Sequence, residues 1–466
     1  MSSKLSSERG AILIQVAVAS IVLIAFSMFI VDYGVMWVSR SQAQNAADSG
    51  ALAGAVALAF DDFDDHTAAG PAKQAALRFA LLNKVFGEDP DVQVNTDVIF
   101  YSDDPTKFPA ECSNDSCIRV DVYRTDKGGR SNPLPMMFGQ LVGLSDQGVR
   151  ATATAKAAGG NAALCVKPWV VADRWDENAD GDDDYMTGPI TWSESSSFDP
   201  VTDLDDGFPD SYVQRTADEF GTGFGQARDD GTLLDYGYQF ILRTGNYGSG
   251  EIGLTSSGWV MTVSLPPNPE LGISGGGTPE TAANISDCTA ATVAIADPSE
   301  QCTEASSTEP DEDGNIIMPC LDVKTGAAWT PLEDDLEAWI GAESMDDMWL
   351  KNGANGGVGE PSRSGSGRII PLALFDPQHY ANGVENGGFN GTNGVVRVVN
   401  VLGFFVEGTC DGGGAFGSFF QESYLPCSTN GQNNDLVGRL VSIPGQQVGA
   451  GDVGPGAFVY VIRLIR

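Results

Sequence analysis

The chain has 466 residues, which is more than one ordinary domain contains and suits two or three. A net charge of -37 at pH 7 argues against nucleic acid as a partner, because such a surface repels phosphate backbones, and a hydrophobic content of 42% excludes wholesale disorder. The 57 glycines and 24 prolines predict many turns, and hence a body rich in strands and loops.

The first predicted element is an apolar run from Ala11 to Val31, interrupted only by Gln15 and two serines. About 20 apolar residues span a bilayer as a helix, and this run has that length. Lys4 and Arg9 precede the run and an acid-rich chain follows it, which places the N-terminus in the cytoplasm. We therefore predict a single-pass membrane protein with its main body outside the cytoplasm.

Three alternatives to a retained membrane helix exist for this run. A cleaved secretory signal would need small residues just after the run, where Asp32 and Tyr33 stand. A buried core helix is disfavoured by the length of the run and its lack of charge. The third alternative is a pilin-type leader, because Gly10 followed by Ala11 resembles the recognition site of a prepilin peptidase. The fifth residue after that glycine is usually glutamate and is Gln15 here, so cleavage between Gly10 and Ala11 stays open.

A helical pattern continues beyond the apolar run, from Trp37 to about Leu58, without proline. Its small residues recur every four positions and so fall on one helix face. Close helix packing is predicted on this face, at Ala43, Ala47, Gly50 and Gly54. The last two match G-x-x-x-G, a spacing that lets backbones approach closely. The pattern does not say whether the partner is this chain's own domain or another subunit.

Several N-terminal features occur together in one protein family. They are Arg9-Gly10, the apolar run, Asp32 at its outer end, Arg40, and an Asn-Ala-Ala-Asp-x-x-Ala-Leu-Ala-Gly-Ala tract that begins at Asn45. This region resembles the TadE/TadG-like Flp (tight adherence) pilus-assembly proteins, strongly over the first 60 residues and only in pattern up to residue 158. The resemblance implies a component anchored in the bacterial inner membrane or associated with the pilus, with other pilus or pseudopilin subunits as partners. Some family members carry a von Willebrand factor A domain with an Asp-x-Ser-x-Ser metal site, and this sequence has no such motif.

After the helix of residues 1–60, the sequence pattern predicts a small α/β unit over residues 61–158. A second helix is expected over Pro71–Phe86, with proline in the first turn. Alternating apolar residues predict three strands, and a short helix is expected between the last two. The strands are Val92–Phe100, Ile118–Tyr123 and Val149–Ala155. A helix on an antiparallel sheet suits a pilin-like head.

Residues 159–466 predict a large β-rich, glycine-rich domain after a hinge at Ala157–Asn161. Near-continuous apolar runs indicate strands that are buried on both faces, as in a sandwich-like core. These runs are Arg368–Phe375, Val395–Val406 and Phe458–Ile465, with a further strand expected at Gly258–Leu265. The predicted fold class is therefore α+β: a long transmembrane helix, a small α/β pilin-like unit and a β-rich sandwich-like domain.

Eight cysteines lie in the part of the chain predicted to be outside the membrane. Zinc is disfavoured, because the only histidines, His66 and His379, lie far apart and no Cys-x-x-Cys occurs. Disulfides in an oxidising compartment are the better interpretation. The most local pairing joins Cys112 to Cys117, Cys288 to Cys302, Cys410 to Cys427 and Cys165 to Cys320, although spacing alone does not fix the connectivity.

An acidic loop between residues 176 and 184 is the best candidate metal site. Its start matches D-x-[DN]-x-[DN]-G, in which alternate oxygens converge on calcium. The candidate ligands are Asp176, Asn178, Asp180, Asp182 and Asp184. The twelfth position is Thr187 instead of a bidentate glutamate, so weak affinity is expected, and a solvated acidic loop is the alternative interpretation. Asp203–Gly207 and Asp311–Asn315 are weaker matches that we interpret as plain turns.

Asp32 stands at the outer membrane–water interface of the predicted helix. An ionisable residue at this level can pair with Arg40 or with a partner helix, and an ordinary interfacial aspartate is the alternative interpretation.

No catalytic constellation is found. A serine triad needs a histidine near G-x-S-x-G, and the chain has neither that arrangement, nor H-E-x-x-H, nor a P-loop. We therefore predict a non-enzymatic, structural component of a Tad/Flp-type pilus or of its assembly machinery. The alternative is a membrane-anchored, calcium-dependent surface adhesin or binding module.

Overall fold

A computed structural model of the chain describes residues 4–60, 65–112, 115–176, 198, 200, 209–216, 221–225, 235–242, 260–272, 278–323, 332–350, 359–363, 365–385, 389, 394–410, 435–446, 448 and 458–465. The chain forms two compact units, one of Met1–Ala158 with Ile462–Arg466 and one of Gly159–Val461. The sequence-based division had assigned residues 462–466 to the second domain and had separated the N-terminal helix from residues 61–158.

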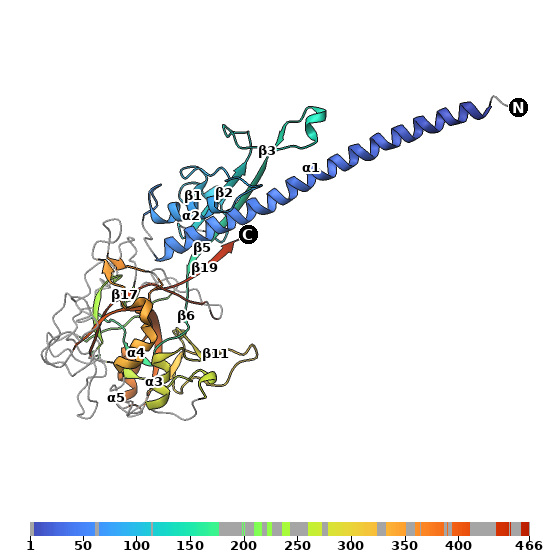
Figure 1. Cartoon of the computed structure of the whole chain (residues 1–466). Coiled ribbons are helices and arrows are strands. Elements are labelled where there is room, and N and C mark those ends of the chain that lie inside the picture. Colours follow the sequence, from blue (N-terminus) through green and yellow to red (C-terminus); the bar gives the residue numbers. More distant parts are fainter. Residues whose placement is uncertain are drawn as a thin grey trace. The chain divides into compact units, whose positions relative to one another are not determined.

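The first unit is built on one continuous helix, α1 (Lys4–Phe60), of 57 residues (Figure 1). Proline is absent from this segment and alanine is frequent, so nothing in the sequence breaks the helix. An 18-residue window of α1 has a mean hydropathy of 2.6 and no buried residue, so the helix is long and apolar enough to cross a membrane by length and composition. The second half of α1 contacts α2 (Pro71–Leu82) and strand β2.

Three antiparallel strands complete the first unit, beside the second half of α1 (Figure 1). They are β1 (Val98–Phe100), β2 (Cys117–Arg124) and β5 (Val149–Gly159). The last residues of β19 (Val459–Ile465), from Ile462 on, also belong to this unit. Val98 pairs with Val120, and Val120 pairs with Ala153. Smaller elements are η1 (Pro105–Lys107), η2 (Gly139–Val142) and the two short strands β3 (Leu134–Pro135) and β4 (Asp146–Gln147).

Two predicted boundaries in this unit were too long. The strand expected from Val92 begins only at Val98, because Asp97 folds the preceding segment into a turn: its side chain accepts a hydrogen bond from the Gln93 amide and its own amide donates to the Gln93 carbonyl. The helix expected to reach Phe86 ends at Leu82, and Phe86 has a positive φ of 51° that no helix contains.

A mixed sheet forms the centre of the second unit, in the order β8-β17-β16-β15-β7-β9, with β12 also paired to β16. Strand β15 runs antiparallel to β16 and parallel to β7. The strands are β7 (Trp169–Ala172), β8 (Gln239–Leu242), β9 (Met261–Thr262), β12 (Cys320–Asp322), β15 (Ile369–Phe375), β16 (Val395–Cys410) and β17 (Asp435–Val441).

Both faces of this central sheet are buried. Side chains alternate along β15, so that Ala373 and Phe375 join one core cluster while Leu372 and Leu374 join another. The first cluster includes the three-stranded sheet of β6 (Ala162–Ala163), β10 (Ala291–Ala294) and β11 (Ile316–Met318), and the second includes helices α3 (Thr278–Ser286) and α4 (Leu332–Ile340). Burial on both faces explains the near-continuous apolar runs, and the predicted α+β class is confirmed.

The remaining elements of the second unit are short. They are η4 (Pro269–Leu271), η5 (Ala342–Ser344), the β13–β14 pair (Trp349–Leu350 and Glu360–Pro361), α5 (Pro377–Glu385) and β18 (Ile443–Pro444).

Three disulfides lie among the described residues, and two of the predicted pairings are wrong. Cys112 bonds Cys117 as expected, but Cys165 bonds Cys288 and Cys302 bonds Cys320. The sheet explains the difference, because β6 and β10 pair antiparallel and so bring Cys165, just after β6, close to Cys288, just before β10. Cys410 ends β16, and its expected partner Cys427 lies outside the described residues.

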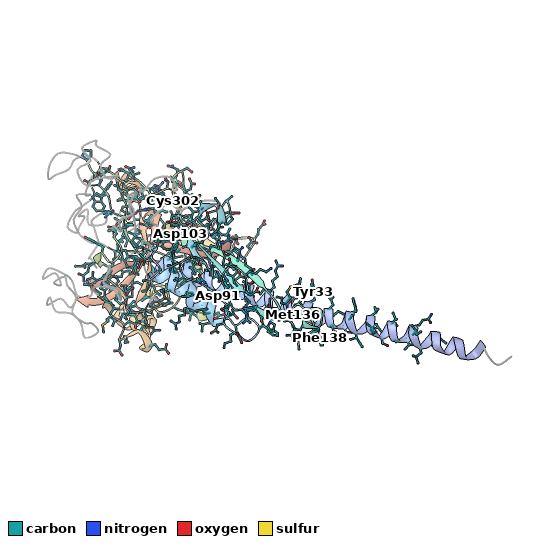
Figure 2. The ribbon with its side chains drawn as sticks, turned by 90° about the horizontal axis from the view of Figure 1, so that it is seen from above. Tyr33, Asp91, Asp103, Met136, Phe138 and Cys302 are labelled. Carbon is teal, nitrogen blue, oxygen red and sulfur yellow. A yellow bond between two sulfur atoms is a disulfide. The ribbon has the colours of Figure 1, made fainter. Side chains whose placement is uncertain are left out.

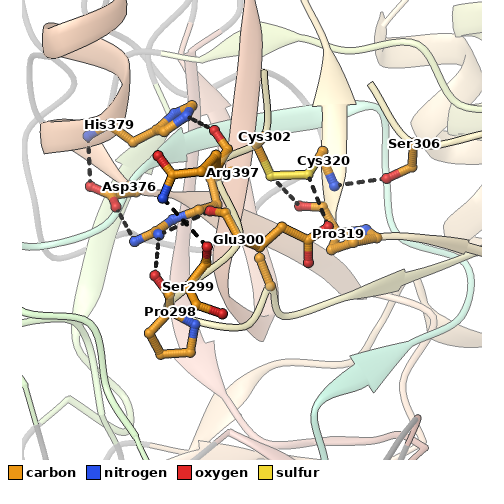
Figure 3. Close-up of a disulfide and its surroundings, with 12 residues drawn as sticks. Pro298, Ser299, Glu300, Cys302, Ser306, Pro319, Cys320, Asp376, His379 and Arg397 are labelled. Atoms are coloured by element: carbon orange, nitrogen blue, oxygen red, sulfur yellow. Dashed lines mark hydrogen bonds and ion pairs between the residues drawn. A yellow bond between two sulfur atoms is a disulfide. The ribbon is translucent and has the colours of Figure 1, made fainter. Parts of the chain in front are cut away.

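The Cys302–Cys320 disulfide fastens a loop to the central sheet (Figure 3). Cys320 pairs across strands with Arg397 of β16. The Arg397 guanidinium binds the Asp376 carboxylate at 2.5 Å and donates to the Pro298 and Glu300 carbonyls at 2.9 and 3.3 Å (Figure 3). These contacts hold the loop that precedes Cys302, so this arginine has a structural role.

Candidate functional site at the N-terminal helix

The first half of α1 exposes a largely apolar surface from Ile12 to Val31, interrupted only by Gln15 and two serines. Leu13, for example, is 72% exposed. At about 1.5 Å per residue, a helix of this length rises roughly 30 Å, which is the thickness of the hydrocarbon core of a bilayer. The segment therefore has both the length and the surface that a membrane span requires.

Three aromatic side chains mark the outer end of this surface. Phe29, Tyr33 and Trp37 follow one another at intervals of four residues, and all three are exposed. Their ring centroids lie 5.9 and 6.4 Å apart in sequence order. Tyrosine and tryptophan are enriched where a membrane meets water, because each combines an apolar ring with a polar group. The sequence analysis missed this row, although its four-residue spacing could have shown it.

Asp32 is buried at the same level of the helix, with 6% of its surface exposed. Its carboxylate accepts hydrogen bonds from three successive backbone amides: Met137 at 2.8 Å, Phe138 at 3.1 and 3.3 Å, and Gly139 at 2.7 Å. These amides open the helical turn η2, where an anion is favoured by the unpaired N–H groups and by the helix dipole. We call this set of contacts the Asp32 junction.

The junction differs from both partners expected for Asp32. Its carboxylate accepts hydrogen bonds from the β3–β4 hairpin, more than 100 residues away in the chain, and not from Arg40 or from a second helix. Charge-assisted hydrogen bonds of this kind are about twice as strong as neutral ones. The junction therefore fixes one level of α1 to one point of the α/β unit.

The β3–β4 hairpin carries an apolar tip along α1. Residues 136–144 contain no charged side chain, and Met137 and Leu144 are 60% and 55% exposed. Phe138 and α1 line an open groove of about 300 Å³. The helix residues that line it all belong to the predicted membrane span: Leu23, Ile24, Ser27, Met28 and Val31.

The second half of α1 packs its small residues within the first unit. Ala43 and Ala47 are fully buried, and Gly50 and Gly54 lie against α2 and β2. A Cβ atom on Gly50 would lie 2.9 Å from the Ala76 carbonyl oxygen, and one on Gly54 would lie 2.7 Å from Ile118 Cδ1. Of the two packing partners left open by the sequence, the structure therefore places the chain's own domain on this face.

The other predicted site residues are only partly described. Gly10 and Ala11 lie inside α1. Asp176 is buried and its backbone pairs with Ser211, whereas Asn178, Asp180, Asp182 and Asp184 lie outside the described residues. In the part of the chain that the structure describes, no group of three or more metal-ligating side chains is found. The Asp311 carboxylate accepts bonds from the Asp313 and Asn315 amides, as in a plain turn.

The burial of two titratable residues in the second unit was not predicted from the sequence. Asp173 accepts bonds from the Phe224 amide and the Tyr212 hydroxyl, and its burial raises the pKa of the carboxyl to about 6. Lys167 donates to the Ile285 and Asp287 carbonyls at 2.8 and 3.1 Å, and its burial lowers the pKa of the amine to about 6. Their bonds to backbone and core residues indicate structural roles.

Comparison with known protein families identifies the same segment of the chain, the helix α1. Residues 10–57 match the Tad family, described as Flp pilus-assembly TadE/G-like. Neither the curated proteins nor the solved structures gave a match to this chain. The matched segment covers nearly all of α1, including the apolar span, Asp32 and the buried small residues, and it confirms the resemblance at the N-terminal region.

Proposed function

We propose that this protein is a structural component of a Tad-type (Flp) pilus or of its assembly machinery, anchored in the bacterial inner membrane by α1. One observation carries the proposal: the segment that matches the pilus-assembly family forms a single helix with two different halves. Its first half exposes the apolar surface of a membrane span, and its second half is part of the core of an α/β unit. That combination suits a subunit whose helix both anchors and supports its head.

The proposed orientation leaves the N-terminus in the cytoplasm and both units in the periplasm or at the cell surface. Lys4 and Arg9 flank the span on the N-terminal side, as cytoplasmic flanks do. The three disulfides support an oxidising compartment for the rest of the chain. The net charge of -37 keeps such a body soluble and away from anionic lipid surfaces.

Partner subunits would pack on the first half of α1. The small-residue face of the second half is occupied by α2 and β2 of the same chain, so it is unavailable to another helix. Residues 12–31 remain exposed on all sides except near Phe138. We therefore assign contacts with other pilus or pseudopilin subunits to this half, within the membrane.

A complementation experiment tests the function. Deleting the protein is expected to abolish or strongly reduce surface pili counted by electron microscopy, and the full chain is expected to restore them. A variant with leucine at every position from 12 to 31 retains an anchor but loses the native packing surface, so it should reach the membrane without restoring pili. An unchanged number of pili in the deletion strain would refute the proposed function.

A further inference from the structure

The β3–β4 hairpin reaches the level at which the proposed membrane span ends. The span begins near Ala11, and Asp32 lies 21 positions later, which corresponds to about 31 Å along a helix. A hydrocarbon core of about 30 Å therefore ends at Asp32. The Asp32 junction binds the hairpin at this height, and the neighbouring aromatic row marks the same level.

The hairpin also extends to the membrane side of the junction. Phe138 covers a groove whose helix residues run from Leu23 to Val31, all of them inside the span. Whatever surrounds those helix residues must also surround Phe138. Figure 2 shows Met136 and Phe138 beside α1, close to Tyr33.

We propose that the tip of this hairpin, residues 136–144, inserts into the outer interface of the bilayer as a second membrane contact. The proposal rests on the membrane anchoring proposed above. The Asp32 junction holds the tip at the membrane surface, Met137 and Leu144 enter the interfacial layer, and a lipid chain fills the groove under Phe138. Two points of attachment fix the depth and the rotation of α1, which a single helix alone leaves free.

The size and chemistry of the tip favour lipid over a protein partner. Two exposed apolar side chains, Met137 and Leu144, present far less surface area than the roughly 800 Å² per partner of a stable protein interface. Shallow insertion of apolar side chains at the headgroup boundary needs no such area. The tip is also uncharged within a strongly acidic chain, so it avoids the repulsion that the rest of the surface meets at anionic lipids.

Photo-crosslinking of the full-length protein in phosphatidylcholine nanodiscs tests the proposal. A photoreactive amino acid is placed at Met137 or Leu144, and intact mass detects lipid adducts. Leu82 is the matched control, because it is an equally exposed apolar residue (64%) in the same unit, near the end of α2. Four residues after Leu82, the backbone amide of Phe86 donates to the Gln42 side chain, which lies about 15 Å farther along α1 than Asp32. Leu82 is therefore expected to lie outside the bilayer.

Lipid adducts at positions 137 and 144, at least tenfold more abundant than at position 82, are the expected result. A second control at Val22, inside the span, separates the two proposals. Two outcomes would overturn the hairpin proposal alone. One is lipid adducts at Val22 without adducts at 137 and 144, and the other is adducts at 137 and 144 that contain a second copy of the chain. Absence of lipid adducts at Val22 would overturn the membrane anchoring and the hairpin proposal with it.

Discussion

At the scale of single residues, Asp32 connects the exposed apolar half of α1 with the folded part of the first unit. Its carboxylate satisfies three backbone amides that have no other partner in a helical turn. Asp32→Ala removes this acceptor, and the loss of a charged cap costs about 2 kcal/mol. Hydrogen exchange of the amides of residues 137–139 should therefore accelerate about 30-fold in detergent-solubilised protein.

Asp146→Ala is the matched control for this prediction. It removes a carboxylate from the same hairpin whose side chain binds Ser145 and not α1. If hydrogen exchange of these amides accelerates equally in the two variants, loss of any nearby carboxylate destabilises the hairpin. The Asp32 junction would then make no specific contribution.

Glycines on α1 test which face of the helix is buried. Gly50→Ala places a methyl group 2.9 Å from the Ala76 carbonyl, so it should lower the free energy of unfolding by about 1–3 kcal/mol. Gly34→Ala on the same helix meets nothing within 4 Å, so it should raise that free energy by about 0.5–1 kcal/mol through helix propensity. Urea unfolding in detergent measures both. A stable Gly50→Ala protein that fails only in pilus assembly would instead indicate that this face binds another subunit.

Lys167 gives the second unit a predictable dependence on pH. Burial lowers the pKa of its amine from 10.5 to about 6, so between these values the unfolded chain binds a proton that the folded chain does not. The contribution of Lys167 to the free energy of unfolding therefore rises with pH from about 6 to 10.5. Lys167→Met should remove this rise in denaturant titrations, whereas the exposed Lys84→Met should preserve it. Identical pH profiles for Lys167→Met and the unmodified chain would contradict the assignment.

The residue scale is where sequence reasoning fell shortest. Asp32 could be singled out from its place at the end of an apolar run, but its acceptor role depends on amides more than 100 residues away. The burial of Lys167 and Asp173 could not be predicted, because nothing in the local sequence shows that the fold encloses them. Only long-range strand pairing could have shown that Cys165 meets Cys288.

At the scale of elements, local patterns were far more informative. Uninterrupted helical sequence predicted α1, and alternation predicted β2 and β5, because one face of each strand packs against a core while the other is more open. Apolar runs predicted β15 and β16, whose two faces contribute to separate cores. Boundaries failed where a side chain ended the element, as Asp97 does before β1.

The Cys302–Cys320 disulfide should stabilise the second unit through its loop. Closing a loop of 18 residues restricts the unfolded chain by about 3 kcal/mol, and closing the five-residue loop of Cys112–Cys117 restricts it by about 2 kcal/mol. We expect the double variant Cys302→Ser, Cys320→Ser to lower the free energy of unfolding of the second unit by about 3 kcal/mol. Changing Cys112 and Cys117 to serine should affect only the first unit. Calorimetry of the two double variants measures this, and a shared effect on both units would contradict independent roles.

At the scale of the whole molecule, an apolar helix half stands at the N-terminal end of an acidic, disulfide-bonded chain. The family match and the apolar half of α1 concern the first 60 residues, whereas the 303 residues of the second unit have no similar structure to compare with. Residue content helped to predict the β-rich character of that unit and the presence of disulfides, because both depend on composition as well as on order. Its specific role within a pilus system depends on surfaces that no motif identifies.

The most direct test of the central claim is the intact mass of the protein from the membrane fraction and from material sheared off the cells. The account predicts that the protein retains residues 12–31 in either fraction, starting at Met1 if the leader is kept or at Ala11 if it is cleaved after Gly10. Protein that remains in the membrane with Met1 would be an anchored assembly component, and sheared protein starting at Ala11 would be a processed pilus subunit. A released chain that starts beyond Val31 would contradict the account, because the helix half that carries the proposed anchor would be absent from the working protein.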